Sequence, residues 1–256
     1  MAELVHDQVL VCGLVPYRDD DLVVRLFTRN FGRVGAFARA ARKSKKRFAG
    51  LVAPALGTAA LKQRSGDLLE LVELDVDARL FRLASDLRAY AFAAYVLELV
   101  ERFVPEGAPQ PELFSLVEET VVFLAQHGAR AAVLRSFELH LLHILGVLPD
   151  LSTVVDEPGA PCEAYDPVSG HLLAHGSAAA VPFSEETRLL AVQLLQRSPG
   201  HSAFLPIAEG GLRAVAPVFG RWLRGQGGAP MKALAFLRSL DEQGRQCVVA
   251  DLDPSR

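Results

Sequence analysis

The hydrophobic period changes once along this chain, near residue 80, and that change limits what the chain can fold into. Before it, apolar residues come in short runs at 9–15, 22–28, 32–39, 55–64 and 68–76, separated by residues that favour turns. Runs of this length and spacing are typical of β-strands. Five strands in about 75 residues predict a small closed barrel such as the oligonucleotide-binding fold (OB-fold).

A helical period follows from residue 81. Good helix formers fill 87–104, where Ser85 and Asp86 are candidate N-cap residues and Pro105 follows the end. Further helices are expected over 111–127, 129–145, 184–197, 212–224 and 231–240, whereas 149–183 has no period and is rich in Pro, Gly, Asp and Ser. The expected fold class is α+β with two domains: an OB-fold barrel over 1–80 and an all-α helical domain over 81–256, with an irregular insertion at about 149–183.

Positive charge is concentrated in the barrel half. Residues 1–64 contain 12 Lys or Arg and 5 Asp or Glu, a net charge of +7, although the whole chain has a net charge of −3 and the rest therefore carries −10. The run 39–47 has six cations and lies in the longest connection between the expected strands. Clustered cations attract polyanions, so this half is expected to bind nucleic acid.

Composition argues against several other classes of protein: disordered, disulfide-rich and membrane-spanning. Half of the residues are apolar and 22% are charged, which argues against disorder. Three widely separated cysteines indicate a reducing compartment rather than a disulfide scaffold. The N-terminus does not resemble a signal peptide, and no apolar run approaches the roughly 18 residues of a membrane span. A cytoplasmic protein with no membrane partner is expected.

The sequence contains no convincing catalytic or metal-binding motif. It has no Gly-x-Ser-x-Gly elbow, no phosphate loop and no His-Glu-x-x-His. The acids 19–21 could bind a divalent ion in a nuclease, but consecutive aspartates are more often a turn. His140 and His143 are one helical turn apart but have no companion carboxylate. We therefore predict no enzyme activity, no catalytic residue, no metal and no cofactor.

Several segments in a fixed order resemble the RecO family of bacterial DNA repair and recombination mediators. The similarity covers most of residues 5–151 and fades afterwards, except near the last expected helix. The similar segments are Arg18–Val34, Ala40–Gly50, Ala94–Glu101, Phe137–Gly146, Pro149–Leu151 and Pro230–Leu237.

The resemblance implies a specific function. It implies an OB-fold domain that binds single- and double-stranded DNA and anneals complementary strands. It also implies partnership with RecR and with the C-terminal tail of single-stranded DNA-binding protein (SSB), leading indirectly to RecA loading on SSB-coated DNA, in the cytoplasm and near the nucleoid. The alternative is a partner-binding scaffold with only generic DNA affinity.

A zinc site found in many relatives is missing. The resemblance places their two Cys-x-x-Cys pairs at Val154 with Glu157 and at Ala174 with Ser177. Cys162 is left as a lone thiol, and with His171 and His175 it supplies at most three of the four ligands that a structural zinc needs. The insertion is therefore zinc-finger-like but without its cysteines.

Two sets of candidate site residues follow. The first would bind DNA: cations contact phosphates, and the two aromatic residues near turns could stack on bases. Its members are Arg25, Arg29, Arg33, Arg39, Arg42, Lys43, Lys45, Lys46, Arg47, Phe31 and Phe48. The second would line a groove for the acidic, apolar SSB tail, and its members are Arg88, Arg102, Arg130 and Arg135.

Overall fold

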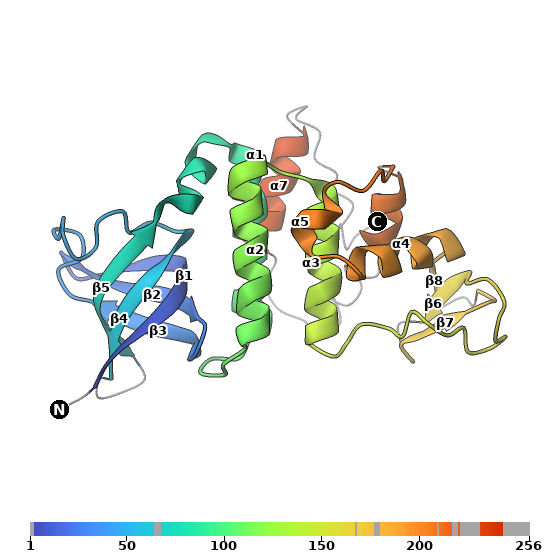
Figure 1. The fold of residues 1–256 in the computed structure, drawn as a ribbon, viewed down its shortest axis with the longest axis horizontal. Coiled ribbons are helices and arrows are strands. Elements are labelled where there is room, and N and C mark those ends of the chain that lie inside the picture. Colours follow the sequence, from blue (N-terminus) through green and yellow to red (C-terminus); the bar gives the residue numbers. More distant parts are fainter. Residues whose placement is uncertain are drawn as a thin grey trace. The chain divides into compact units, whose positions relative to one another are not determined.

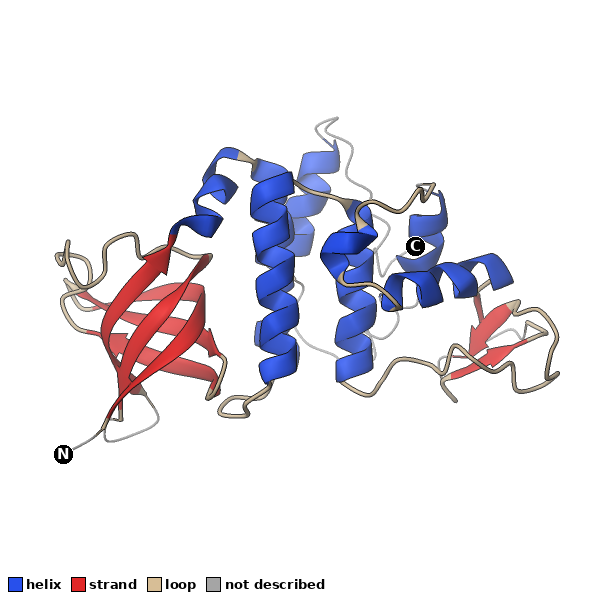
Figure 2. Cartoon of the chain, viewed as in Figure 1, coloured by secondary structure: helices blue, strands red, loops and turns tan. Residues whose placement is uncertain are grey.

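A computed structural model of the chain describes residues 3–63, 68–166, 168–176, 180–208, 210–216, 220 and 231–242. The chain forms two compact units, residues 1–128 and 129–256. The sequence suggested a domain boundary at 80/81, whereas the first unit also includes two long helices after the strands. The helical and strand segments are coloured in Figure 2.

The first unit opens with a closed five-stranded barrel in the order β1-β2-β3-β5-β4, with β1 and β4 paired to close it. This is the strand order of an OB-fold and confirms the predicted fold class. The barrel strands appear in blue to green in Figure 1. Their bounds are β1 Leu4–Tyr17, β2 Asp21–Thr28, β3 Gly32–Ala38, β4 Ala55–Lys62 and β5 Leu69–Asp77.

Strand β1 is longer than the run that predicted it because its two halves pair with different neighbours. Residues 4–11 pair with β4 and residues 9–17 pair with β2. The register shifts between Val11 and Gly13, where a bulge bends a strand. A bent strand shared by two neighbours allows a five-stranded sheet to close, and closure removes its exposed edges.

Three helices complete the first unit: the 3₁₀ helix η1 (Ala78–Ser85), α1 (Leu87–Phe103) and α2 (Pro111–His127). The Asp86 carboxylate caps α1 by accepting hydrogen bonds from the backbone N–H groups of Arg88 and Ala89, both at 3.0 Å. Phe27 of β2 packs against Phe114 of α2, with ring centroids 5.5 Å apart. The barrel and α2 therefore share apolar packing within this unit.

The second unit contains α3 (Ala131–Ile144), α4 (Glu185–Leu195), α5 (Pro199–Ser202) and α7 (Lys232–Glu242). Helices α3, α4 and α7 confirm predicted helices, whereas the short α5 was not predicted. Residues 210–216 are also helical, and most of the predicted helix over 212–224 lies outside the described residues. The insertion is not wholly irregular, because it contains a small sheet in the order β7-β6-β8. Its strands are β6 Ala164–Asp166, β7 His171–Leu173 and β8 Val181–Pro182.

Candidate nucleic-acid interface

The six cations of residues 39–47, here called the basic loop, follow β3 and precede β4 on the barrel. Its backbone forms successive turns rather than a helix or strand. All six cationic side chains are exposed: Arg39, Arg42, Lys43, Lys45, Lys46 and Arg47. Exposed cations on a connection between barrel strands can approach a phosphate backbone without disturbing the core.

The β1–β2 turn, residues 18–20, and the adjoining Asp21 of β2 hold one end of the basic loop. The Asp21 carboxylate accepts a hydrogen bond from the backbone N–H of Ala40 at 2.8 Å, and Ala40 has a positive φ of 53°. Arg42 donates to the carbonyl oxygen of Asp19 at 3.1 Å, and Lys43 forms an ion pair with Asp20. The consecutive aspartates therefore form a turn that positions the loop.

The other end of the basic loop is attached to β5 and to the barrel core. The carbonyl oxygen of Arg47 accepts a hydrogen bond from the backbone N–H of Leu74 at 2.9 Å. The next residue, Phe48, is only 4% exposed and belongs to the core cluster of the barrel. The Arg47 guanidinium lies 5.0 Å from the centroid of the Phe48 ring. Phe48 thus anchors the loop, and a base cannot stack on it in this conformation.

The basic-loop cations differ in how far they are already paired. In the described part of the chain, no ion pair involves Arg39, Lys45 or Lys46. Arg47 donates to the carbonyl oxygen of Arg39 at 3.0 Å, a neutral acceptor that leaves its charge uncompensated. Arg42 likewise donates to a neutral carbonyl oxygen, that of Asp19, whereas Lys43 is paired with Asp20. The charge that the loop presents to solvent therefore comes mainly from these five residues, Arg39, Arg42, Lys45, Lys46 and Arg47.

Arg25, Arg29 and Arg33, in contrast, form ion pairs with glutamates of the helical part of the same unit. Arg25 Nε lies 3.2 Å from Glu101 Oε1 of α1. Arg33 donates to the carbonyl oxygen of Val104 at 2.6 Å and lies 3.4 Å from Glu106. These contacts connect the barrel strands to α1 and to the segment after it.

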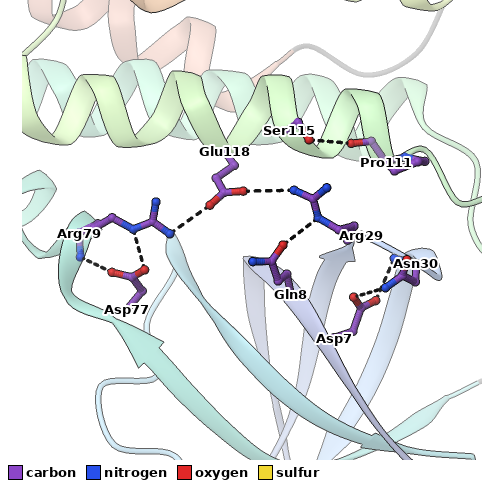
Figure 3. A network of polar contacts seen from close by, with 9 residues as sticks. All are labelled: Asp7, Gln8, Arg29, Asn30, Asp77, Arg79, Pro111, Ser115 and Glu118. Carbon is purple, nitrogen blue, oxygen red and sulfur yellow. Dashed lines mark hydrogen bonds and ion pairs between the residues drawn. The ribbon is translucent and has the colours of Figure 1, made fainter.

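Arg29 lies at the centre of a polar network between the barrel and α2 (Figure 3). Its Nε donates to Gln8 Oε1 at 2.7 Å, and its Nη2 lies 3.7 Å from Glu118 Oε2. The same glutamate accepts a hydrogen bond from Arg79 at 3.0 Å, and Arg79 also donates to Asp77 at 2.6 Å. One carboxylate thus connects the turn after β2, and also η1, to α2.

Burial raises the pKa values of two groups near Arg25, the Glu101 carboxyl and the Cys12 thiol. It raises the pKa of Glu101, although the positive charges of Arg25 and Arg33 act against the rise. Burial, with the charge of Glu101 adding to it, also raises the pKa of Cys12 to about 12. A cysteine with so high a pKa is almost entirely the unreactive thiol at neutral pH.

Glycine permits one of these arginine contacts. A Cβ atom built on Gly13 would lie 2.1 Å from the Arg25 guanidinium, so any larger residue would displace that side chain. Gly32 has a φ of +70°, and a Cβ there would lie 2.2 Å from the carbonyl oxygen of Ala108. Glycine is therefore required at position 32, whereas a side chain at position 13 would move the Arg25 guanidinium out of its place beside Glu101.

The exposed aromatic residues beside the basic loop are not the predicted ones. Phe31 is half-buried against the barrel core. Phe81 of η1 and Tyr90 of α1 are 53% and 37% exposed. The sequence pattern did not single them out, because they lie in helical segments away from the cation run; only their helical register could have indicated exposure.

The four arginines proposed for a partner groove are distributed over both units. Arg88 and Arg102 lie near opposite ends of α1, about 21 Å apart along its axis. Arg130 is the exposed N-cap residue of α3, and Arg135 is 1% exposed and paired with Glu138. The described contacts do not gather these residues into one site.

The described residues also bear on the zinc question. They contain no group of three or more His, Cys, Asp and Glu side chains placed to hold a metal ion. Val154 and Ala174, two of the positions to which the resemblance assigns the cysteines of many relatives, are buried in the apolar core of the second unit. Ser177 lies outside the described residues. Apolar packing thus occupies two of the positions at which the resemblance would place zinc ligands, and the described residues do not fit a zinc ion.

The fold and surface define a class: an OB-fold protein with an exposed basic loop, followed by a helical unit. Comparison with protein families gives a more specific result. The model of the recombination protein O N-terminal domain matches residues 1–75, and that of the C-terminal domain matches residues 84–235. The chain therefore belongs to the RecO family of DNA repair proteins.

Curated relatives support this assignment along most of the chain. The DNA repair protein RecO of Geobacter sulfurreducens is 34% identical over 249 residues, covering 92% of this chain and 98% of the relative. The RecO protein of Anaeromyxobacter dehalogenans is 37% identical over 220 residues, covering 82% and 83%. In the described residues, no helix has the length and apolarity needed to cross a membrane.

Proposed function

We propose that this protein binds single- and double-stranded DNA through the basic loop and anneals complementary strands. The observation that supports this proposal is the set of exposed basic-loop cations for which no ion pair is found in the described part of the chain: Arg39, Arg42, Lys45, Lys46 and Arg47. Phosphate contacts by such residues supply affinity with little sequence preference. The strand arginines, whose charges are paired with glutamates, contribute less to this surface.

The proposed biological role is that of a recombination mediator. With RecR, the protein would help to load RecA onto single-stranded DNA coated with SSB, near the nucleoid. Annealing requires no nucleotide and no bond cleavage, because a cationic surface that neutralises two backbones lowers their mutual repulsion. If the protein binds each strand weakly enough to release and rebind it, the two strands can shift against each other until their bases pair in the correct register.

The helical part would receive partners. Membership of the RecO family supports binding of the acidic C-terminal tail of SSB, for which Arg88, Arg102, Arg130 and Arg135 were the candidates. Arg130 is exposed, whereas Arg135 is buried beside Glu138. Titration of a labelled tail peptide against the wild type and Arg130→Ala tests this; unchanged binding would remove Arg130 from the site.

The direct experiment mixes two complementary strands, one of them coated with SSB, and follows duplex formation without ATP. Acceleration on the coated strand supports the mediator. Acceleration on naked strands alone would reduce the protein to a generic DNA binder, and no acceleration on either would favour a partner-binding scaffold. Cleavage of labelled DNA with magnesium would contradict a non-enzymatic role.

A further inference from the structure

An apolar groove lies in the first unit, where the segment after the basic loop faces η1 and the start of α1. Its volume is about 510 Å³, and none of its lining residues is charged. Among the lining residues, Val52 and Phe81 are 50% and 53% exposed, and Tyr90 is 37% exposed. Tyr90 Oη donates to the carbonyl oxygen of Ala53 at 3.4 Å, which directs this ring toward the loop segment.

A second hollow connects the apolar groove to the basic loop. This hollow, of about 720 Å³, is lined by Lys46 and shares Gly50 and Phe81 with the apolar groove. Phe81 therefore lies between a cationic side chain of the loop and the uncharged groove. Lys46, Phe81 and Tyr90 form a continuous track from charged to aromatic surface.

We infer that the apolar groove receives an unpaired base of a single strand whose phosphates lie on the basic loop. The inference deepens the proposed function and rests on it. Aromatic rings beside cations suit single-stranded nucleic acid, because every base offers a flat face to stack on while its backbone needs positive charge. The basic loop, of which Lys46 lines the hollow beside the groove, favours this polyanion over an apolar peptide, which the groove alone would suffice to bind.

Charge also determines where the backbone can run. Glu73 and Asp75 of β5 line the hollow together with Lys46 and would repel a phosphate placed against them. Phosphates are thus confined to the loop side, near Lys45, Lys46 and Arg47, and only the uncharged part of a nucleotide can enter the groove. A duplex stacks its base faces internally, so the groove acts on single strands and not on double strands.

The test uses Phe81→Leu, which keeps an apolar side chain but removes the ring. The matched control is Phe204→Leu, a change at another exposed phenylalanine, which is 75% exposed in the second unit. Three labelled probes of equal length are titrated: an oligothymidylate, a strand of abasic nucleotides and a duplex. Thermal unfolding of each variant confirms that the fold is retained.

We expect Phe81→Leu to weaken oligothymidylate binding by about fivefold or more, which corresponds to the loss of one stacked base. Binding of the abasic strand and of the duplex should not change, and the salt dependence should keep its slope because no phosphate contact is lost. Phe204→Leu should behave as the wild type on all three probes.

Unchanged oligothymidylate binding by Phe81→Leu would overturn the inference, and so would an equal loss on the abasic strand. A labelled acidic, apolar peptide that binds the wild type and is lost with Phe81→Ala, while DNA binding persists, would make the groove a protein-docking site instead. Lys46→Ala distinguishes failure of the base-stacking inference from failure of the proposed function. If Lys46→Ala weakens binding of every probe while Phe81→Leu changes none, DNA binding by the basic loop stands and only the base-stacking inference fails.

Discussion

Arg29 and Lys46 carry the same charge in different surroundings. The Arg29 guanidinium hydrogen-bonds to Gln8, pairs with Glu118 and lies 5.1 Å from the centroid of the Phe114 ring. Lys46 is exposed, and in the described part of the chain no ion pair reaches it. The first cation is expected to act on stability and the second on DNA binding.

Replacing Arg29 by Ala should lower the free energy of unfolding by about 1–2 kcal/mol, because a hydrogen bond and a cation–π contact are lost and Glu118 keeps only one partner. DNA affinity should change little. Thermal unfolding and DNA titration of the same sample measure both effects. Lys46→Ala, which also removes one positive charge, is the matched control. It should weaken DNA binding and leave the free energy of unfolding nearly unchanged. An Arg29→Ala variant of unchanged stability and weakened DNA binding would contradict the assignment.

At the scale of elements, the three aspartates at 19–21, which span the β1–β2 turn and the start of β2, both position the basic loop and compensate part of its charge. Asp20 pairs with Lys43, whereas Asp19 and Asp21 accept hydrogen bonds from the loop. The loop therefore presents fewer cations to solvent than its composition suggests.

Asp20→Asn should release Lys43 and remove one negative charge, so affinity for a single strand should rise at low salt. The log–log salt slope should become steeper by about 0.7 if Lys43 gains one phosphate contact. Fluorescence anisotropy with a labelled oligonucleotide measures both. Glu112→Gln, at an exposed acid in the first turn of α2, is the charge-matched control. Weaker binding by a folded Asp20→Asn variant would instead show that the ion pair orients the loop for DNA.

In the second unit, the start of α4 is attached to the insertion through one carboxylate. Glu185 accepts hydrogen bonds from Arg188 at 2.8 Å and from the backbone N–H of Cys162 at 3.0 Å. These contacts lower the pKa of Glu185 from 4.5 to about 2. Arg188 in turn donates to the carbonyl oxygen of Leu151 at 2.7 Å.

Because the folded-state pKa of Glu185 is lowered, its contribution to stability is present above pH 4.5 and is lost as pH falls toward about 2. Glu185→Gln should therefore be less stable than the wild type at pH 6, and the difference should shrink below pH 4.5. Urea unfolding followed by circular dichroism across this range measures the difference. Glu186→Gln, at an exposed neighbouring acid, should show no such convergence. A difference independent of pH would exclude the carboxylate as its cause.

At the scale of the whole molecule, periodicity predicted most of the fold. The predicted strands matched β1 to β5, and the predicted helices matched α1 to α4. Each of these elements buries an apolar face, so its apolar residues recur in the sequence with the period of a strand or a helix. Strands β6 to β8 were missed because they have only two or three residues each, too few for an alternating pattern. The double pairing of β1 could not be predicted either, because register depends on residues far apart in sequence.

The site was less predictable than the fold. The run 39–47 was visible in the sequence because its charges are adjacent, and the structure places all six cations at the surface. The ion pairs of Arg25, Arg29 and Arg33 were not visible, because their partners lie far along the chain, in α1, in α2 and in the segment between them. Glu106, for example, follows Arg33 by 73 residues. Composition counts charge, whereas only the fold shows which charges compensate one another.

The net charge of +7 in residues 1–64 therefore overstates what a nucleic acid meets. Three arginines of the barrel connect it to its own helices, and Lys43 is paired with Asp20. The phosphate contacts are therefore expected on the other five cations of the basic loop.

The salt dependence of single-strand binding by Lys45→Ala/Lys46→Ala/Arg47→Ala tests this claim most directly. About five phosphate contacts give the wild type a log–log slope of roughly −3 to −4. Loss of three contacts should flatten it by about two units, with thermal unfolding nearly unchanged because all three side chains are exposed. A variant that folds and keeps the wild-type slope would contradict the account, because its phosphate contacts would then lie elsewhere on the protein.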